Sequence, residues 1–522
     1  MKLNINLCFL ASVVLVLACM PKKKETNLLY YSEKHRPQFH FTPERNWMND
    51  PNGMVYYAGE YHLFYQYYPD GNVWGPMHWG HAISTDLVSW QHLPVALYPD
   101  SLGLIFSGSA VIDFNNTSGL GSANNPPMVA IFTQHLMKGE KEGKHDFQTQ
   151  GIAYSLDKGR TWKMYAKNPV ITNPGKHDFR DPKVSWHETS QQWVMILAVK
   201  DHVELYGSSN LIDWRYLSDF GIDKGTHGGV WECPDLFEIE IAESGSKKWV
   251  MLVSINPGAP NGGSGTQYFI GQFDGKKFMA DSSDTLWIDQ GKDNYAGVTW
   301  SNVPTNDGRR LFLGWMSNWQ YAGIVPTTKW RSSMTIARSL ELIQTDDGLR
   351  LSSKPVDELE KWRGEPIDLM KEISAEPSSK QIKLADSTFE INLTISRTTL
   401  QDSLELKFSN EKGEWITFGL DGNTNQFFVD RTHAGVSFST DFDGKHIGKR
   451  SSTATDLTIR LLMDTSSGEL FADDGTLVMT ELFFPAEEFN QLQLIKSKGV
   501  VIKSMVYYPI KSSWNKNDNV NQ

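Results

Sequence analysis

Ser84-Thr85-Asp86-Leu87-Val88-Ser89-Trp90 is a turn sequence that recurs along this chain. Ser155–Trp162 and Ser208–Trp214 repeat its pattern, Ser-x-Asp or Ser-x-Asn with a Trp a few residues later, and Phe273–Phe278 is a degraded fourth copy. We expect the Asp or Asn to cap each turn and the Trp to pack between sheets, without a chemical role. Recurrence of one hairpin turn indicates the blades of a β-propeller, in which radial repetition leaves only short sheet edges.

Short apolar runs of β type surround these turns. From His35 to Glu341 they are broken by Gly, Asn, Asp or Pro roughly every eight to twelve residues, and no convincing amphipathic helix interrupts them. Examples are Tyr61–Tyr67, Met128–Phe132, Trp193–Ala198 and Lys248–Val253. This spacing predicts an all-β region, and we assign residues 35–350 to the propeller.

The pattern changes after residue 350. Lys354–Trp362 is typical of a short helical connector, and we assign residues 351–368 to a linker. Beyond it, apolar residues alternate with polar ones at Phe389, Ile391, Leu393, Ile395, Leu404, Leu406, Phe408, Leu457, Ile459 and Leu461. A period of two with one apolar side predicts two sheets that face each other, so we expect residues 369–522 to form a β-sandwich.

Composition excludes some classes of partner. The chain has 522 residues, enough for two domains, and a net charge of -11 without a long basic run. Nucleic acid is therefore not an expected partner, because its phosphates require a surface rich in Lys and Arg. The 18 Trp, 18 Tyr and 26 Phe suit the apolar faces of sugars, although many such rings simply belong to cores.

No cofactor or metal is expected. The 14 His are scattered, and His227, beside Gly228 and Gly229, has no partner at the spacing of metal ligands. Gly262-Gly263-Ser264-Gly265 lacks the Lys and the helix that a phosphate-binding loop needs.

The N-terminus has the features of an export signal. Lys2 precedes an apolar run, Leu7–Ala18, which is too short to span a membrane and ends directly before Cys19. A small residue before Cys at this point resembles the signal of bacterial lipoproteins, so residues 1–19 are the expected signal peptide and Cys19 the lipidated residue. Ordinary signal cleavage is the alternative.

This interpretation gives the expected location. Residues 20–34 begin with a polar stretch and would form a tether, leaving a water-soluble protein held in the bacterial cell envelope only by its acyl chains. The face of the membrane stays open. Besides Cys19 the chain has only Cys8 and Cys233, so no disulfide framework is expected.

Three acidic residues far apart in the chain stand in constrained settings. They are Asp50 in Trp47-Met48-Asn49-Asp50-Pro51-Asn52-Gly53, Asp181 in Phe179-Arg180-Asp181-Pro182, and Glu232 in Gly229-Val230-Trp231-Glu232-Cys233-Pro234-Asp235. The Pro-Asn-Gly turn fixes the backbone after Asp50, so that carboxylate can be aimed.

The neighbours of two of these residues indicate different protonation states. Trp231 and Cys233 flank Glu232 with apolar bulk, which favours its protonated form, whereas Asp50 lies beside the Asn49 amide and is the better ionised group. An acid paired with an ionised carboxylate can hydrolyse a glycosidic bond.

In this order the three motifs resemble the signature motifs of glycoside hydrolase family 32, which contains invertases, inulinases and levanases. The resemblance implies a five-bladed β-propeller followed by a β-sandwich, and Gly468–Gly475 is similar to the family's sandwich motif. It also implies that Asp50 attacks the anomeric carbon, and that Glu232 protonates the leaving group and later deprotonates water. Configuration would be retained, with the two carboxyl groups about 5–5.5 Å apart.

The same resemblance gives a role to Asp181, which would bind two ring hydroxyls of the fructosyl unit in the transition state. Arg180 would hold that carboxylate ionised and oriented. From the residues alone, a salt bridge within a turn is the alternative. Further positions match pocket residues of the family: Trp47, Asn49, Gln66, Trp74, Phe106, Ser107, Arg180, Cys233, Tyr295 and Trp315. This chain departs from the family at Asn294, where members often have Phe.

The expected substrate is a fructan. Gly314–Ala322, with Trp330-Arg331 after it, looks more like fructanases of the levanase type than sucrose-preferring invertases. We favour β-2,6 levan only slightly over β-2,1 inulin, leave endo or exo attack open, and expect a monomer with other oligomeric states open. Alternatives are a hydrolase of sucrose and short oligosaccharides, a non-catalytic fructan-binding lipoprotein, and a relative acting on arabinose- or xylose-based chains.

Overall fold

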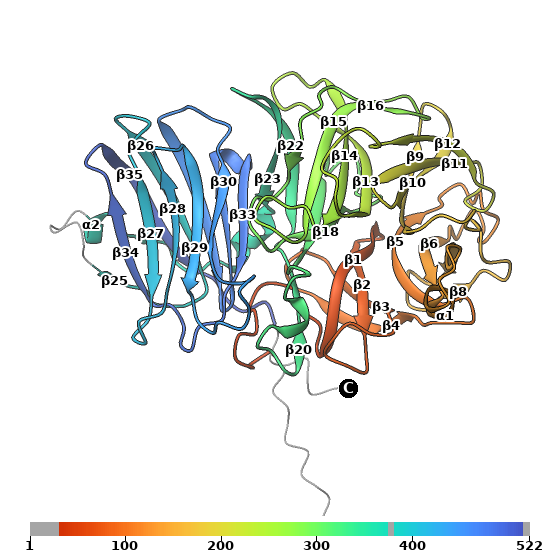
Figure 1. Ribbon diagram of the computed structural model, residues 1–522, viewed down its shortest axis with the longest axis horizontal. Helices are drawn as coiled ribbons and strands as arrows, with labels where there is room; N and C mark the ends of the chain where they lie inside the picture. The colour runs from red at the N-terminus through yellow and green to blue at the C-terminus, as the bar shows by residue number, and fades with distance from the viewer. Residues whose placement is uncertain (1–30, 374–380, 515–522) are drawn as a thin grey trace, which may run out of the picture.

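The computed structural model describes residues 31–373 and 381–514. Figure 1 shows two neighbouring β domains, one coloured red to green in which sheets surround an axis, and one coloured blue in which two sheets face each other. The predicted all-β class, with a propeller followed by a sandwich, is confirmed.

Five sheets form the blades of the propeller. Blade 1 contains β20 (Trp330–Arg331), β1 (Asn46–Tyr57), β2 (Glu60–Tyr68), β3 (His78–Ser84) and β4 (Gln91–Leu97). Blade 2 contains β5 (Leu104–Ile112), β6 (Met128–His135), β7 (Gln148–Ser155) and β8 (Lys163–Met164). Blade 3 contains β9 (Phe179–His187), β10 (Gln192–Val199), β11 (His202–Ser208) and β12 (Arg215–Phe220).

Each of the two remaining blades includes an additional strand of two residues, β17 (Leu286–Trp287) or β21 (Ser333–Met334). Blade 4 contains β13 (Val230–Glu240), β14 (Lys247–Asn256), β15 (Gly265–Phe273), β16 (Phe278–Ala280) and β17. Blade 5 contains β18 (Tyr295–Thr299), β19 (Arg310–Met316), β21, β22 (Arg338–Thr345) and β23 (Gly348–Pro355). The short helices α1 (Met137–Lys141) and η1 (Ala322–Ile324) lie in connections.

The first strand of each blade lies nearest the axis. These inner strands contact one another in a closed ring, β1 with β5, β5 with β9, β9 with β13, β13 with β18 and β18 with β1. Blade 1 is completed by a late segment of the chain, because β20 pairs in parallel with β1, with Asn46 opposite Trp330. This pairing ties the start of the propeller to its end.

The repeated turns connect the third and fourth strands of blades 1 to 4. Asp86 Oδ1 accepts hydrogen bonds from the backbone N–H groups two and three residues later, at 3.0 and 2.7 Å, and Asn210 Oδ1 does the same at 3.0 and 2.8 Å. Leu87 and Leu211, the residues between, have left-handed φ values of 64° and 63°. The expected capping role is confirmed, and the carboxylate or amide stabilises this backbone.

Two six-stranded sheets form the sandwich. The first contains β24 (Ile367–Asp368), β35 (Val500–Pro509), β26 (Phe389–Arg397), β31 (Asp456–Asp464), β32 (Ser467–Ala472) and β33 (Leu477–Leu482). The second contains β25 (Gln381–Lys383), β34 (Gln491–Lys496), β27 (Leu404–Ser409), β28 (Trp415–Asp421), β29 (Gln426–His433) and β30 (Lys445–Lys449). The alternating apolar residues named above are buried in one core between the sheets. The helices here are α2 (Met370–Ile373) and η3 (Asp473–Gly475).

The segment between the two domains is shorter at both ends than the predicted linker, 351–368. β23 runs to Pro355 and pairs with β22, so the propeller extends past residue 350. Pro355 fits there because β23 is an edge strand, where a missing backbone N–H costs no ladder bond. The expected helical connector is the 3₁₀ helix η2 (Asp357–Trp362). β24 already pairs with β35, so the sandwich begins before residue 369.

Buried charges join the two domains. His40, just before the propeller, has Nδ1 2.8 Å from Asp464 Oδ2 and Nε2 2.8 Å from Glu469 Oε1, both in the sandwich. Arg338 of β22 pairs with Glu469 and, at 3.0 Å, with Asp289. Burial alone lowers the pKa of His40, but its bonds to the two carboxylates outweigh burial and raise that pKa to about 9.

The His40 contact predicts a loss of stability at alkaline pH. Because the folded pKa, about 9, exceeds the ordinary 6.5, the contribution is complete below about pH 6.5 and is lost as pH rises through 9. The shift corresponds to a free energy on the order of 3 kcal/mol. We expect His40→Gln to be less stable than the parent at about pH 6 and the gap to narrow by about pH 10, measured by denaturant unfolding. His433→Gln, at an exposed position, is the control, and a gap independent of pH would contradict the assignment.

Candidate active site

Every inner strand of the propeller has a break in pairing register beside a functional side chain. The breaks lie at or next to Asp50 in β1, Ser107 in β5, Asp181 in β9, Glu232 in β13 and Tyr295 in β18. Bulges of this kind redirect side chains and are frequent beside active sites. Each blade therefore contributes at least one polar side chain to a common site.

Asp50 is held by two donors. Asn49 Nδ2 donates to Asp50 Oδ1 at 3.0 Å, and Ser107 Oγ donates to Oδ2 at 2.7 Å. Trp47 Nε1 donates to Asn49 Oδ1 at 2.7 Å, which orients the amide so that its N–H faces the carboxylate. Burial and the charge of Glu232 raise the pKa of Asp50, whereas the two donors lower it. The buried Trp47 thus acts on this site through Asn49.

Glu232 lies between a cation and a phenol. Arg180 donates to Glu232 Oε1 from Nε at 3.2 Å and from a terminal nitrogen at 3.0 Å. The hydroxyl of Tyr295 donates to Oε2 through a short hydrogen bond. The Glu232 side chain keeps 22% of its surface exposed, so it remains accessible to a substrate.

The neighbours of Asp181 and Glu232 differ in part from those expected from the sequence. Arg180 pairs with Glu232 and Asp178, and its nearest approach to Asp181 is 4.0 Å. Successive side chains of a strand point to opposite faces, and at Asp181 the backbone also turns into the left-handed region, with φ 65°. For the same reason Trp231 does not flank Glu232: it packs in the blade core and donates to Thr226 O.

Asp181 is fixed from the neighbouring blades. Its backbone N–H donates to Thr133 Oγ1 at 2.9 Å, and Cys233 N donates to its Oδ2 at 3.1 Å. Burial raises the pKa of Asp181 to about 7, the charge of Arg180 opposes this, and Glu232 and Asp50 add to it. The charges of the other two carboxyl groups thus act directly on Asp181.

Cys233 joins two of these carboxyl groups. Its Sγ lies 3.5 Å from Asp50 Oδ2 and 3.7 Å from Asp181 Oδ2. Burial and the three carboxylates raise the pKa of Cys233 well above its ordinary value, so it stays a neutral thiol. It acts as a weak donor in the wall of the site.

The remaining predicted positions lie around this network. Gln66 Nε2 donates to Ile105 O at 3.1 Å, which supports β5 two residues before Ser107. Trp74 is 40% exposed and meets Phe106 edge to face at 6.1 Å. No contact joins Trp74 or Phe106 to the carboxylates within the described residues, so they stand farther out.

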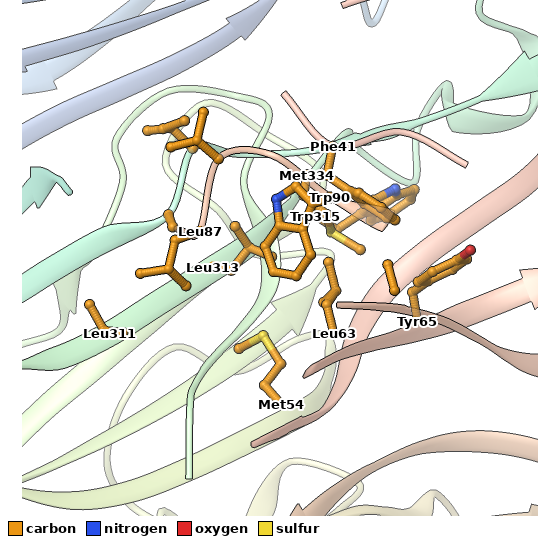
Figure 2. Close-up of a cluster of buried hydrophobic side chains, with 14 of the residues drawn as sticks. Phe41, Met54, Leu63, Tyr65, Leu87, Trp90, Leu311, Leu313, Trp315 and Met334 are labelled. Carbon is orange, nitrogen blue, oxygen red and sulfur yellow. The ribbon is translucent and has the colours of Figure 1, made fainter. Parts of the chain in front are cut away.

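Trp315 lies behind the site. Figure 2 shows it among apolar side chains from both ends of the propeller, including Phe41, Leu63 and Met334. Its indole N–H is buried and has no hydrogen-bond partner among the described residues. That N–H is therefore a buried donor without a protein partner in the described part of the chain.

Sequence reasoning did not single out three supporting residues. The amide of Asn52 donates to Ser107 Oγ at 3.2 Å and accepts from Gln66 N at 3.1 Å. Thr133 holds the backbone of Asp181, and Asp178 pairs with Arg180. Asn52 lies within the first motif and Asp178 beside the second, so both could have been found. Thr133 had no local signal.

The channel is closed beneath the acids. Lys183 of β9 pairs with Asp235 of β13 at 3.3 Å, and Thr299 of β18 donates to the same carboxylate from N and Oγ1 at 2.7 and 2.8 Å. Beyond this plug lies a cavity of about 470 Å³ lined by the far ends of the inner strands. None of the three carboxylates lines that cavity, so it is separate from the site.

Residues 31–373 and 381–514 contain no group of three or more side chains placed to hold a metal ion. Within those same ranges, no helix has the length and apolar character to cross a membrane.

Comparison with known proteins places these features in a family. Residues 40–355 match the N-terminal domain of glycosyl hydrolases family 32, and residues 358–509 match its C-terminal domain. A levanase of Bacillus subtilis (strain 168) is 50% identical over 93% of this chain and 72% of its own length. An extracellular exo-inulinase of Aspergillus awamori is 38% identical over 93% of this chain and 96% of its own.

Solved structures agree in both domains. The crystal structure of the exo-inulinase from Aspergillus awamori superposes with a TM-score of 0.84 at 36% identity, covering 93% of this chain and all of that one. A singly substituted fructofuranosidase of Schwanniomyces occidentalis, complexed with fructosylnystose, gives 0.83 at 35% identity over 92% of this chain and 99% of that one. The chain therefore belongs to glycoside hydrolase family 32 and is a glycoside hydrolase.

Proposed function

We propose that this protein hydrolyses the β-fructosidic bonds of fructans from the chain end, by a retaining double displacement, with levan preferred to inulin. The observation that carries the proposal is the contact network that joins Asp50, Asp181 and Glu232 on three bulged inner strands. A fructan-binding protein without activity would not need this set of acids. The similarity to a levanase and to exo-inulinases supports the substrate class and the mode of attack.

In the first step, a carboxylate oxygen of Asp50 forms a bond to C2 of the terminal fructosyl unit. The bond from C2 to the leaving oxygen breaks, and that oxygen takes the proton of Glu232. Asn49 and Ser107, the two donors to Asp50, hold the nucleophile ionised and aimed. Asp181, fixed by Cys233 and Thr133, accepts hydrogen bonds from ring hydroxyls as positive charge develops on the sugar.

In the second step, Glu232 removes a proton from water, whose oxygen attacks C2. The bond between C2 and Asp50 breaks, which restores the carboxylate and releases fructose. Arg180 and Tyr295 remain as donors to Glu232 through both steps, and they stabilise its charged form when it acts as the base. The free indole N–H of Trp315 is a candidate donor to the bound sugar.

The motif that favours polymer use has an indirect role. Trp315, Met316, Asn318 and Tyr321 of Gly314–Ala322 are buried, and Asn318 holds the backbone carbonyl of Lys292 at 2.9 Å. This segment supports the wall of the site, and Trp319, which stacks against Trp47 at 5.9 Å, is its partly buried ring. The proposed preference for levan therefore rests on the similarity to a levanase, and the rates of hydrolysis of levan, inulin and sucrose test it.

Removing the acid should be tolerated when the leaving group is good. We expect Glu232→Ala to lose about a hundredfold to ten-thousandfold in kcat/KM on levan, but far less on an aryl β-fructofuranoside with an acidic phenol, which needs no proton. Asp50→Ala should lose activity on both. Asp346→Asn, at the exposed β22–β23 turn, is the control and should keep the parent rates. Equal losses on both substrates in Glu232→Ala would show that it is not the acid.

The products report the mode of attack and the stereochemistry. We expect fructose alone from the first minutes on levan and on inulin, a faster rate on levan than on inulin or sucrose, and β-fructofuranose as the first anomer. Chromatography by size and time-resolved NMR measure these quantities. A ladder of oligosaccharides would rule out end attack, the α anomer would rule out retention, and a preference for sucrose would favour an invertase-like enzyme.

We also propose that the mature protein is anchored in the bacterial envelope by acyl chains on Cys19. Cys19 and the whole signal peptide, 1–19, lie outside the described residues, as does most of the tether, 20–34, so the support is the sequence alone.

The anchor can be tested by labelling. In a bacterial host that processes lipoproteins, we expect the protein to incorporate labelled palmitate and to fractionate with membranes, and Cys19→Ala to lose the label. Cys8→Ala, inside the cleaved segment, is the matched control and should keep it. A Cys19→Ala protein that is still labelled would exclude this anchor.

A further inference from the structure

The segment that leads into β18 lies on the sandwich domain. Gln290 N donates to Val478 O at 2.7 Å and Asp293 N donates to Thr480 O at 3.0 Å, so residues 289–293 run along β33. Gly291 permits this approach, because a Cβ there would lie 2.2 Å from Thr480 N and 2.4 Å from its O. The chain therefore leaves the sandwich immediately before it enters the innermost strand of blade 5.

A buried cation holds the end of that segment. Arg431 of β29 pairs with Asp293 Oδ2 at 2.5 Å and with Glu481 at 2.9 Å, and it donates to the hydroxyl of Tyr321 at 2.9 Å. The same hydroxyl donates to Asp293 Oδ1 in a short bond, so Arg431 and Tyr321 together bind both oxygens of Asp293. The side chains of Arg431, Asp293 and Glu481 are fully buried, so removing one of them leaves its buried partners with fewer compensating groups.

The contacts of Asp293 fix the chain just before Tyr295. Tyr295 follows Asp293 by two residues, and its hydroxyl donates to Glu232 Oε2. Between them Asn294, the departure from the family pattern, donates to Asp289 Oδ2 at 3.1 Å. β18 has five residues, and its pairing with β19 is irregular between Tyr295 and Val298. Tyr295 pairs with Trp315, but regular pairing resumes only at Val298, and the segment upstream of the tyrosine is held by the sandwich.

We propose that the sandwich domain positions the general acid, with Arg431 acting through Asp293 and Tyr295 to fix the carboxyl group of Glu232. The proposal rests on the acid role given to Glu232 under the proposed function. Arg431 and Asp293 are positioning residues, since they contact neither Glu232 nor its other neighbours.

Several polar and charged groups surround Glu232. Arg180 from β9 and Tyr295 from β18 donate to it, Asp50 and Asp181 lie nearby as carboxyl groups, and Cys233 adjoins it as a neutral thiol. If the Tyr295 donor moves away, the charged form of Glu232 loses a hydrogen bond while the other groups stay. Proton delivery from Glu232 to the leaving oxygen then loses its geometry.

The test compares Arg431→Gln with Tyr295→Phe and with the double variant. On levan we expect Arg431→Gln to lower kcat about tenfold to a hundredfold with little change in KM, and we expect the same effect from Tyr295→Phe. On the aryl β-fructofuranoside with an acidic phenol both losses should largely vanish. In the Tyr295→Phe background, Arg431→Gln should add little, and Arg431→Lys should restore part of the rate.

Two controls separate positioning from stability. Arg363→Gln breaks another buried ion pair, with Glu390 at 2.6 Å, and should lower the unfolding midpoint without changing the leaving-group dependence. Tyr321→Phe keeps the Arg431–Asp293 pair but removes one donor to Asp293, so it should lower kcat less than Arg431→Gln, with the same leaving-group dependence. This variant replaces Arg431→Gln in the test if Arg431→Gln does not fold.

The outcomes are distinguishable. Equal losses on levan and on the aryl substrate, or full additivity with Tyr295→Phe, would each overturn the positioning role, even in an active enzyme. If Glu232→Ala itself shows no dependence on the leaving group, the acid assignment fails and this proposal fails with it.

Discussion

Burial of three carboxyl groups within hydrogen-bond networks that touch one another is the constraint on which the rest of this structure depends. Such groups repel when charged and lose solvation when buried, so each needs donors at fixed positions. Arg180 comes from β9, Ser107 from β5, Tyr295 from β18, and Cys233 N from β13. The donors come from different blades, and only a closed ring of inner strands brings them together.

The bulges explain how β-strands can direct neighbouring side chains into one site. A regular strand would turn every second side chain away from the axis and keep consecutive residues on opposite faces. Breaks in register at Asp50, Asp181 and Glu232 free these residues from strict alternation. As a result Cys233 contacts Asp181 with both its backbone N–H and its thiol, while its neighbour Glu232 faces Arg180. Local irregularity thus increases the number of polar groups that one strand presents.

The same irregularity limits what could be predicted from the sequence. The blades followed from the Ser-x-Asp turns, and the sandwich from the alternation around Phe389, since both signals are local. The three acids were found because turn and motif chemistry surrounds them. Arg180 lies within 4.0 Å of Asp181, as expected, but its closer pairing with Glu232 could not be foreseen because the bulge at Asp181 is not visible in the sequence. Arg431 was beyond reach, because it meets Asp293 from 138 residues away and from another domain.

The plug beneath the acids restricts how a polymer can approach. Lys183, Asp235 and Thr299 cross the channel on β9, β13 and β18, a few residues past Asp181, Glu232 and Tyr295. Because these buried side chains bond to one another beneath the acids, we expect a polysaccharide to approach from the side on which Glu232 is exposed. The β33 edge of the sandwich carries the segment before Tyr295 at that level, which makes the second domain part of the site's frame. An enzyme built like this depends on the junction of its two domains for its chemistry as well as for its stability.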